Sequence, residues 1–136
     1  MTTLTSTQQE DIHTYINSQW DTTVIPTLCS YIKIPNVSPI FDDNWHTNGY
    51  LEEATTLLAD WAKSIDMNCQ VDVLHEPDRT PLIFIEIPPT EGQGEGKENT
   101  ILMYGHLDKQ PPLTEDWRDG LGPYVPVIED GKVCLC

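Results

Sequence analysis

The sequence predicts an α/β fold with a mixed sheet flanked by helices. Apolar residues recur at helical spacing in the first half of the chain, and short β-branched apolar segments follow in the second half. The resulting order of helix, helix, strand, strand, strand is typical of the opening of an α/β domain. The 136 residues, of which 38% are hydrophobic, are enough for one modest domain with a core.

Two helices are predicted before the strands. The first covers residues 5–33, with Ser6 as its N-cap and a glutamine three positions later to complete a capping box. Pro26 should kink this segment or split it in two, because proline disrupts the preceding helical turn. A loop is expected over residues 33–45. A second helix, with an apolar stripe wide enough to face a core, is expected over residues 48–65.

Three strands are predicted next. Residues 68–74 alternate between apolar and polar, as a half-buried strand does. Residues 82–87 are continuously apolar and β-branched, which favours a central strand buried on both faces. A loop rich in glycine and glutamate follows at residues 90–99, and residues 100–104 form another buried apolar strand.

A β-hairpin is predicted at the end of the sequence, with strands at residues 124–128 and 132–135 and a turn at Asp130-Gly131. The sequence stops within the second of these strands. We therefore expect residues 1–136 to be a truncated N-terminal segment of a larger domain, with 134–136 as a divergent tail. A sheet without its later strands should aggregate or depend on another chain, because it would expose apolar residues such as Ile83, Ile85 and Ile101.

The charge, the hydropathy and the cysteines of the sequence limit which partners and which cellular location are expected. Twenty-two acidic and seven basic residues give a formal net charge of −15, which excludes nucleic acid as an expected partner. No apolar stretch is long enough for a membrane helix, and residues 1–6 lack the basic and apolar parts of a secretory signal. We therefore expect a cytoplasmic protein with no membrane partner. Cys29 and Cys69 are expected to be reduced core residues, and Cys134 and Cys136 have no histidine or second cysteine pair nearby for a metal site.

One segment places candidate catalytic groups at the end of a predicted strand. His106 and Asp108 are two residues apart, so in extended backbone their side chains point to the same side. Open α/β sheets bind ligands at this edge, and a carboxylate beside an imidazole can fix the ring of a metal ligand. The same residues are also what an ordinary polar loop after a strand contains, and the spacing alone leaves both interpretations open.

The surrounding sequence resembles a known motif. Ile101-Leu102-Met103-Tyr104-Gly105-His106-Leu107-Asp108-Lys109-Gln110-Pro111-Pro112 is similar to the first metal motif, Gly-His-x-Asp, of the dinuclear-zinc metallopeptidases that include carnosinase, aminoacylase, glutamate carboxypeptidase and succinyl-diaminopimelate desuccinylase. The Gln-Pro-Pro ending is closest to the carnosinase-like cytosolic dipeptidases. Similarities to the same branch at residues 32–38, 79–84, 115–123 and 127–132 extend the resemblance over almost the whole chain.

This resemblance implies roles for two residues. His106 would be a ligand of one zinc ion, and Asp108 would be the catalytic aspartate that orients it. In a complete form, which can be a homodimer, two Zn²⁺ ions would serve the hydrolysis of dipeptides or N-acyl amino acids. The family's other ligands and its general-base glutamate have no counterpart in this sequence. The chain also departs from the family at Lys109, where an aliphatic residue is common, and at residues 133–136, where a Tyr-Gly-Arg-Gly-type segment is expected.

Other interpretations remain open at this stage. The chain is either a metallopeptidase fragment, a hydrolase of N-acyl or carbamoyl bonds on the same scaffold, or an inert remnant that binds a partner through an exposed sheet edge. His46 beside Asp42 and Asp43 could bind a cation, although aspartates in loops commonly form turns and caps. Trp117 is expected to pack within its loop or to line a substrate cleft. Ordinary polar or packing roles are expected for His13, His75, Trp20, Trp45 and Trp61.

Overall fold

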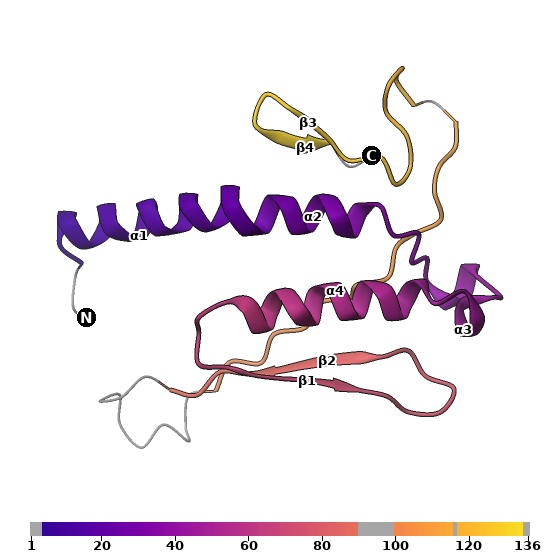
Figure 1. Ribbon diagram of the computed structural model, residues 1–136, viewed down its shortest axis with the longest axis horizontal. Coiled ribbons are helices and arrows are strands. Elements are labelled where there is room, and N and C mark those ends of the chain that lie inside the picture. The colour runs from indigo at the N-terminus through magenta and orange to yellow at the C-terminus, as the bar shows by residue number, and fades with distance from the viewer. Residues whose placement is uncertain (1–3, 90–99, 116, 135–136) are drawn as a thin grey trace. The chain divides into compact units, whose positions relative to one another are not determined.

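The computed structural model describes residues 4–89, 100–115 and 117–134, and the predicted loop at residues 90–99 lies outside them. The chain divides into two compact units, which are described separately (Figure 1). Unit 1 contains Met1–Lys33 and Leu113–Cys136. Unit 2 contains Ile34–Pro112 and with it both His106 and Asp108.

Unit 1 begins with a long helical segment in three parts. Helix α1 (Ser6–Gln19) is followed by a π-helical turn (Trp20–Val24) and by helix α2 (Ile25–Ile32). The N-cap of α1 is Thr5, which forms a capping box with Gln8. The prediction of Ser6 as the cap is therefore wrong by one position, because Thr5 offers the same hydroxyl acceptor one residue earlier.

Pro26 follows a π-helical turn and does not split the helical segment, which runs without a break from Ser6 to Ile32. The backbone N–H of Ile25 donates to the carbonyl of Trp20, which is the wider π-type bond rather than the α-type bond. The Thr22 and Thr23 hydroxyls donate to the carbonyls of Ser18 and Gln19, 2.6 and 2.9 Å away. The helix therefore continues past the proline because a wider turn and two side chains satisfy the carbonyl groups that precede it.

The hairpin of unit 1 forms where the sequence predicts it. Strand β3 (Val127–Glu129) pairs antiparallel with strand β4 (Lys132–Cys134). Asp130 and Gly131 connect the strands with φ values of 49° and 72°, the left-handed region that a two-residue hairpin turn requires. An ion pair between Arg118 and Glu129, with 2.5 Å between Nη2 and Oε2, joins the preceding loop to β3.

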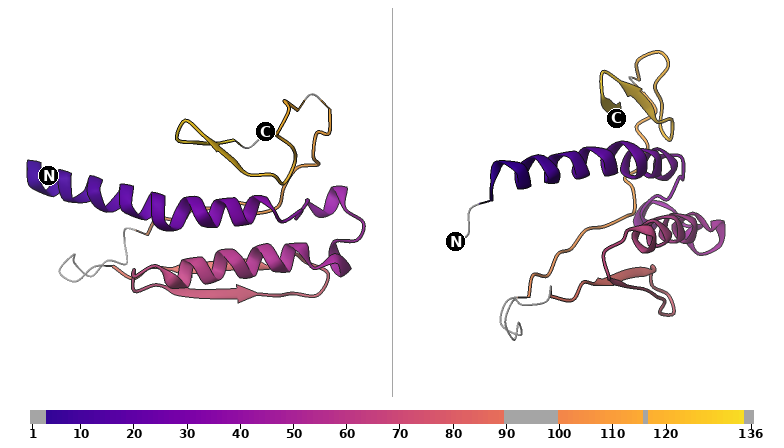
Figure 2. Two further views of the ribbon diagram at one scale, coloured as in Figure 1. Left: turned by 45° about the horizontal axis from the view of Figure 1, so that its top comes forward. Right: turned by 60° about the vertical axis from the view of Figure 1, so that its left-hand side comes forward.

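Unit 2 consists of a helix packed on a strand pair, as both views of Figure 2 show. Helix α3 (Trp45–Asn48) leads through Gly49, whose φ of 77° favours glycine, into helix α4 (Tyr50–Ser64). Strand β1 (Gln70–Leu74) pairs antiparallel with strand β2 (Leu82–Glu86), with Asp72 opposite Phe84 at the centre. Helix α4 packs against both strands.

The core of unit 2 is one face of α4 together with a nearby loop. The buried residues of α4 follow helical spacing, as predicted for a core-facing helix; they are Leu51, Ala54, Thr55, Ala59 and Ala62. Ile34 and Asn36, in the loop that opens this unit, are also buried. The small side chains of α4 allow close packing on the strands, and the hydroxyl of Thr55 is satisfied by the carbonyl of Leu51 at 2.7 Å.

The predicted strand at residues 100–104 is not formed, and the prediction that it is buried is wrong. This segment has no regular secondary structure, and Ile101, Leu102, Met103 and Tyr104 are between 85% and 89% exposed. An apolar, β-branched segment becomes a buried strand only when neighbouring strands pair with it, and none of the described residues does so. The apolar pattern was identified correctly, but its structural environment was not.

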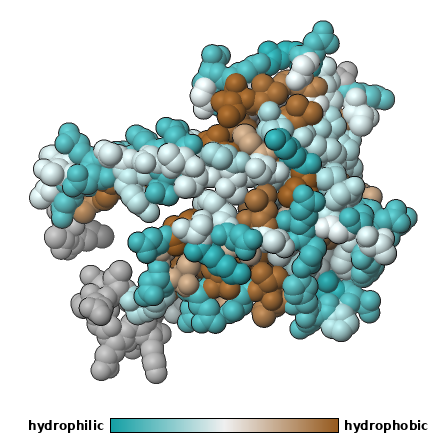
Figure 3. Space-filling view, in the orientation of Figure 1, coloured by the Kyte–Doolittle hydropathy of each residue, from teal (hydrophilic) through white to brown (hydrophobic). Residues whose placement is uncertain are grey.

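The sheets are accordingly smaller than expected. The structure combines helices with two separate two-stranded antiparallel sheets, which is compatible with the α/β class. Among the described residues there is no mixed sheet, and one isolated parallel bridge joins Val37 to Lys109. Of the three residues expected to be exposed, Ile85 and Ile101 are exposed and Ile83 is half-buried. Figure 3 shows hydrophobic side chains reaching the surface among polar ones.

Within the described residues, no helix combines the length and the apolar character needed to cross a bilayer.

Replacement of Leu51 by alanine should destabilise unit 2 strongly. Leu51 is 4% exposed, so the change removes a side chain from the core and should lower the free energy of unfolding by about 2–5 kcal/mol. Leu113→Ala is a matched control, because Leu113 is 80% exposed and the same change there should cost less than about 0.5 kcal/mol. Urea denaturation measures both values. Equal effects of the two substitutions would contradict the packing of α4 described above.

Candidate functional site

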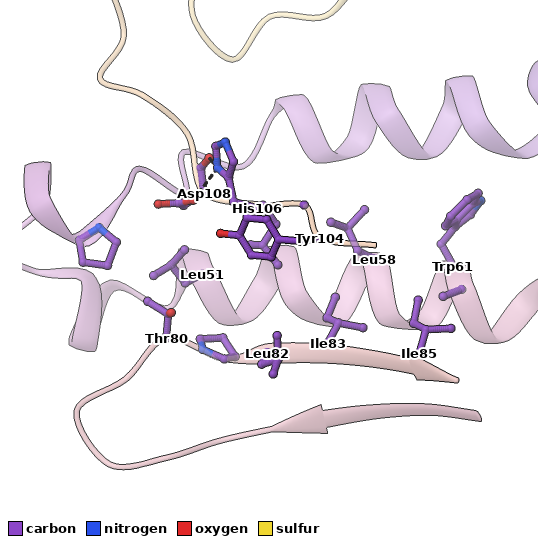
Figure 4. Close-up of a pocket in the computed structure, with 15 residues that line it drawn as sticks. Leu51, Leu58, Trp61, Thr80, Leu82, Ile83, Ile85, Tyr104, His106 and Asp108 are labelled. Carbon is purple, nitrogen blue, oxygen red and sulfur yellow. Dashed lines mark hydrogen bonds and ion pairs between the residues drawn. The ribbon is translucent and has the colours of Figure 1, made fainter. Parts of the chain in front are cut away.

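The structure brings His106 and Asp108 into direct contact. His106 Nδ1 lies 2.8 Å from Asp108 Oδ1 and 3.1 Å from the carbonyl oxygen of Asp108 (Figure 4). Both acceptors lie at the same ring nitrogen, so they favour the tautomer with the proton on Nδ1. The lone pair of Nε2 is then available to an electrophile, and the His106 side chain is exposed.

Asp108 is the more enclosed member of this pair, and its charge is stabilised locally. A hydrogen bond from the Ser38 side chain is the main cause that lowers the pKa of the Asp108 carboxyl below its ordinary value. Burial acts in the opposite direction, and the contact with His106 lowers the pKa further. Asp108 is therefore a carboxylate at neutral pH, the form that accepts the proton of an imidazole.

The segment around the site is held by a polar clamp between Asn36–Ser38 and Leu107–Lys109. Lys109 N donates to the Asn36 carbonyl over 2.9 Å, and Ser38 N donates to the Lys109 carbonyl over 2.8 Å. The Asn36 side chain, which is completely buried, donates from Nδ2 to the Leu107 carbonyl over 2.7 Å. The clamp fixes the backbone on both sides of Asp108 although residues 100–104 are not paired.

Lys109 completes this clamp with its side chain. Its ammonium donates to the carbonyl of Ile34 over 2.5 Å and to the Oδ1 atom of Asn36. Burial lowers the pKa of Lys109 to about 8, while the two acceptor oxygens favour the charged form. The lysine noted in the sequence as a departure from the family pattern is thus a structural part of the site region.

Sequence reasoning did not identify the clamp. The contacts of Asn36 and Ile34 with Leu107 and Lys109 join residues that are 71 to 75 positions apart, and no short spacing pattern marks such a pair. A possible signal was the asparagine within an apolar Ile-Pro-Asn-Val segment. A buried amide needs hydrogen-bond partners, so a polar residue in that pattern predicts a specific contact but does not reveal its partner.

His106 and Asp108 lie at one end of a pocket of about 660 Å³ within unit 2 (Figure 4). Its remaining walls are mostly apolar and come from α4, from β2 and from the segment before His106; they include Leu58, Trp61, Leu82, Ile83, Ile85 and Tyr104. The indole Nε1 of Trp61 is buried without a hydrogen-bond partner in the described part of the chain. The pocket therefore joins a polar pair to an apolar groove.

The residues near His106 do not form a complete zinc site. A protein zinc site usually has about three or four ligands. Across residues 4–89, 100–115 and 117–134, no group of three or more histidine, cysteine, aspartate or glutamate side chains is arranged to hold a metal ion. His106 fits the role of one ligand with an oriented ring. The donor set among the described residues is too small for a zinc site.

The other histidines have ordinary contacts. His75 Nε2 lies 2.8 Å from Glu52 Oε1, a surface contact that links α4 to the end of β1 and that the sequence did not predict. His46 stacks on Trp45, with ring centroids 3.5 Å apart. His13 is exposed on α1. The contact of His75 and the exposure of His13 agree with the polar roles expected for these two residues.

Loop residues also have structural roles. Asp42 accepts hydrogen bonds from the backbone of Asn44 and from the side chain of Asn48, over 3.0 and 2.6 Å, as a turn-forming aspartate does. Trp117 Nε1 donates to the carbonyl of Leu113, which agrees with packing within its own loop. Cys29 and Cys69 are free, half-buried thiols. The side chains of Cys134 and Cys136 lie outside the described part of the chain.

Replacement of Ser38 by alanine should raise the pKa of Asp108. The substitution removes the hydroxyl that contributes most to lowering that pKa, while burial, which raises it, remains. Carboxyl ¹³C chemical shifts followed during an acid titration measure the change. Ser38→Thr keeps a hydroxyl and should leave the pKa of Asp108 closer to that of the unchanged protein. The same pKa in all three proteins would exclude Ser38 as the main cause.

The half-buried ammonium of Lys109 should make the free energy of unfolding depend on pH in the alkaline range. The pKa of Lys109 is about 8 in the folded chain and 10.5 in its ordinary environment, so the unfolded chain binds more protons between these values. The free energy of unfolding should therefore rise as the pH increases from about 8 to 10.5. Lys109→Met should abolish this rise, whereas the same change at exposed Lys63 should retain it. Denaturation midpoints across that pH range test both statements.

Comparison with known proteins identified no relative that could assign a function to this site. No protein-family model and no curated protein matches this chain. The features that bear on function are the contact between His106 and Asp108, the clamp beside it and the sequence motif that contains the pair.

Proposed function

We propose that this chain contributes the pair His106–Asp108 to the active site of a carnosinase-like, dinuclear-zinc hydrolase. In a complete form, such an enzyme hydrolyses dipeptides or N-acyl amino acids. The observation that carries the proposal is the 2.8 Å contact between His106 Nδ1 and Asp108 Oδ1, which leaves Nε2 exposed. This contact is the arrangement expected of a metal-ligand histidine and the carboxylate that orients it.

Each residue of the pair has a separate task in this proposal. Asp108 accepts the Nδ1 proton of His106, which fixes the orientation of the ring and raises the basicity of Nε2. Its lowered pKa keeps it ionised for this purpose. His106 then provides one neutral imidazole ligand at Nε2. A bound metal pair would supply an acidified water and polarisation of the scissile carbonyl.

The rest of such a site must come from residues outside the described part of this chain. One imidazole and one orienting carboxylate are fewer than the ligands that zinc needs, and a general-base carboxylate is also required. The described segment would act as a half-site: it positions one ligand, and the apolar groove beside it is suited to a substrate side chain or to further elements of the fold. We expect the chain alone to bind zinc weakly.

The remaining features of the proposal concern location and partners. The free thiols of Cys29 and Cys69 suit a reducing compartment, so we propose a cytoplasmic protein. A small peptide or N-acyl amino acid is the proposed substrate of the complete form, which can be a homodimer. The net charge of −15 disfavours nucleic acid as a partner.

One observation favours a second, non-catalytic function. Ile101, Leu102, Met103 and Tyr104 are apolar and almost fully exposed, as a segment that contacts another polypeptide would be. A chain that is inert as an enzyme could bind a partner through this segment without using His106. Substitution of His106 distinguishes the two functions, because it should affect metal binding and leave association unchanged.

Titration with zinc should identify His106 as the preferred histidine. Because Asp108 orients the ring and raises its basicity, the His106 resonances should respond to zinc before those of His13, His46 and His75. Two-dimensional NMR of the imidazole nitrogens measures the order. His106→Ala should remove the first response, and Asp108→Asn should weaken it.

His13→Ala is the matched control, because His13 is an exposed histidine in α1, far from the motif in sequence, and its loss should leave the first response unchanged. Equal responses of all four histidines would contradict the proposed role of Asp108. Tight binding of about two zinc ions per chain, together with dipeptide hydrolysis that His106→Ala abolishes, would show that the half-site interpretation is wrong.

A further inference from the structure

The exposed segment Ile101–Tyr104 has the properties of an unpaired strand. Its four residues are all apolar, they are between 85% and 89% exposed, and no strand among the described residues pairs with them. A run that is apolar at every position is typical of a strand that is buried on both faces. Exposed backbone donors and acceptors in such a segment are a template for pairing with another chain.

Strand β2 presents a second unpaired edge in the same unit. It pairs with β1 on one side, and the described residues place no strand on its other side. The pocket described above is lined by Leu82, Ile83 and Ile85 of β2, and by Tyr104 and the residues that follow it. Leu58 and Trp61 of α4 also line it (Figure 4). The groove thus has the edge of β2 on one wall, the segment that contains Tyr104 on another, and apolar residues of α4 beside them. These are the surroundings that an additional strand between β2 and the segment would have.

We propose that two copies of this chain associate by exchanging Ile101–Tyr104, so that the segment of each copy occupies the groove of the other. The resulting strand order is β1, β2, the partner's segment, the copy's own segment, then β2 and β1 of the partner. A two-fold axis between the two central segments relates the copies. Each segment then has two neighbours, and both grooves are filled by the same contact, as in a closed, isologous dimer.

The composition of the segment suits this occupant. Every side chain is apolar, so either face of the inserted strand can lie against α4, and a shift of one residue in register would bring no charged side chain into the groove. The chain itself carries both the groove and a strand that fits it. A second copy therefore satisfies both unpaired edges at once, whereas an unrelated peptide would fill the groove and leave one face of the arrangement open.

This dimer fills the apolar part of the pocket that His106 and Asp108 also line, but it does not need His106 as a metal ligand. If the two-fold axis passes between Leu102 and Met103, the two copies of His106 lie on opposite sides of it. Along the antiparallel strands they are then about seven residues apart, which is roughly 23 Å. The dimer does not bring the two imidazoles to one metal ion. Association should therefore be unchanged by zinc or by His106→Ala, and failure of one proposal leaves the other intact.

Sedimentation velocity over a range of protein concentrations tests the dimer. The unchanged chain should form a dimer that does not grow further. Leu102→Asp should raise the dissociation constant by roughly 100-fold, because it buries an unpaired carboxylate in each groove. Ile40→Asp is the matched control, since Ile40 is 80% exposed outside the segment and the same charge is added there without effect.

A second variant and a local measurement complete the test. Met103→Pro removes a backbone donor from the segment, which pairs with none of the strands that the structure describes, and should also abolish the dimer. Hydrogen exchange should show concentration-dependent protection at residues 101–104 and 82–86. A chain that stays monomeric up to about 100 μM would overturn the proposal. So would open-ended oligomers, equal weakening by Ile40→Asp, or protection confined to other residues.

Discussion

The structure around the candidate site depends on one buried side chain. Asn36 is fully enclosed, donates to the carbonyl of Leu107 and accepts from the ammonium of Lys109. A buried amide is unfavourable unless its polar atoms are paired, so this residue specifies one arrangement of two segments that are distant in the sequence. Without such a contact, the extended backbone that carries His106 and Asp108 would have little to fix it, because its preceding residues are unpaired.

The hydrogen bonds of Asn36 also connect the segment of His106 and Asp108 to the packed core of unit 2. Ile34 is buried beside Asn36, and α4 buries Leu51 and its small residues against β1 and β2. The clamp therefore connects a packed core to a segment whose own side chains are exposed. Hydrogen bonds hold the backbone on both sides of Asp108. Only a few residues earlier, Ile101–Tyr104 are exposed, because none of the described strands pairs with them.

Local patterns in the sequence were sufficient to predict most elements of this fold. The stripe of α4, the alternation in β1 and the Asp130-Gly131 turn each produced the expected structure, because helical spacing, strand alternation and turn chemistry are properties of neighbouring residues. The apolar run of β2 did produce a strand, but the prediction that this strand is central and buried on both faces is wrong: among the described residues it pairs only with β1, and most of its residues are exposed. The spacing of His106 and Asp108 likewise predicted that their side chains would share one side. The burial of residues 100–104 failed as a prediction because burial depends on what pairs with a strand. The clamp at Asn36 was missed because its partners lie 71 or more positions away.

The π-helical turn at Trp20–Val24 has a consequence for the surface of the first helical segment. Residues placed four apart advance by about 40° around a regular α-helix at each step, so a stripe of Ile12, Ile16, Trp20, Val24, Leu28 and Ile32 would wind away from its starting side. A wider turn in the middle of this stripe takes up part of that rotation. The π-helical turn therefore keeps the apolar residues of α2 closer to the side of the helix on which those of α1 lie.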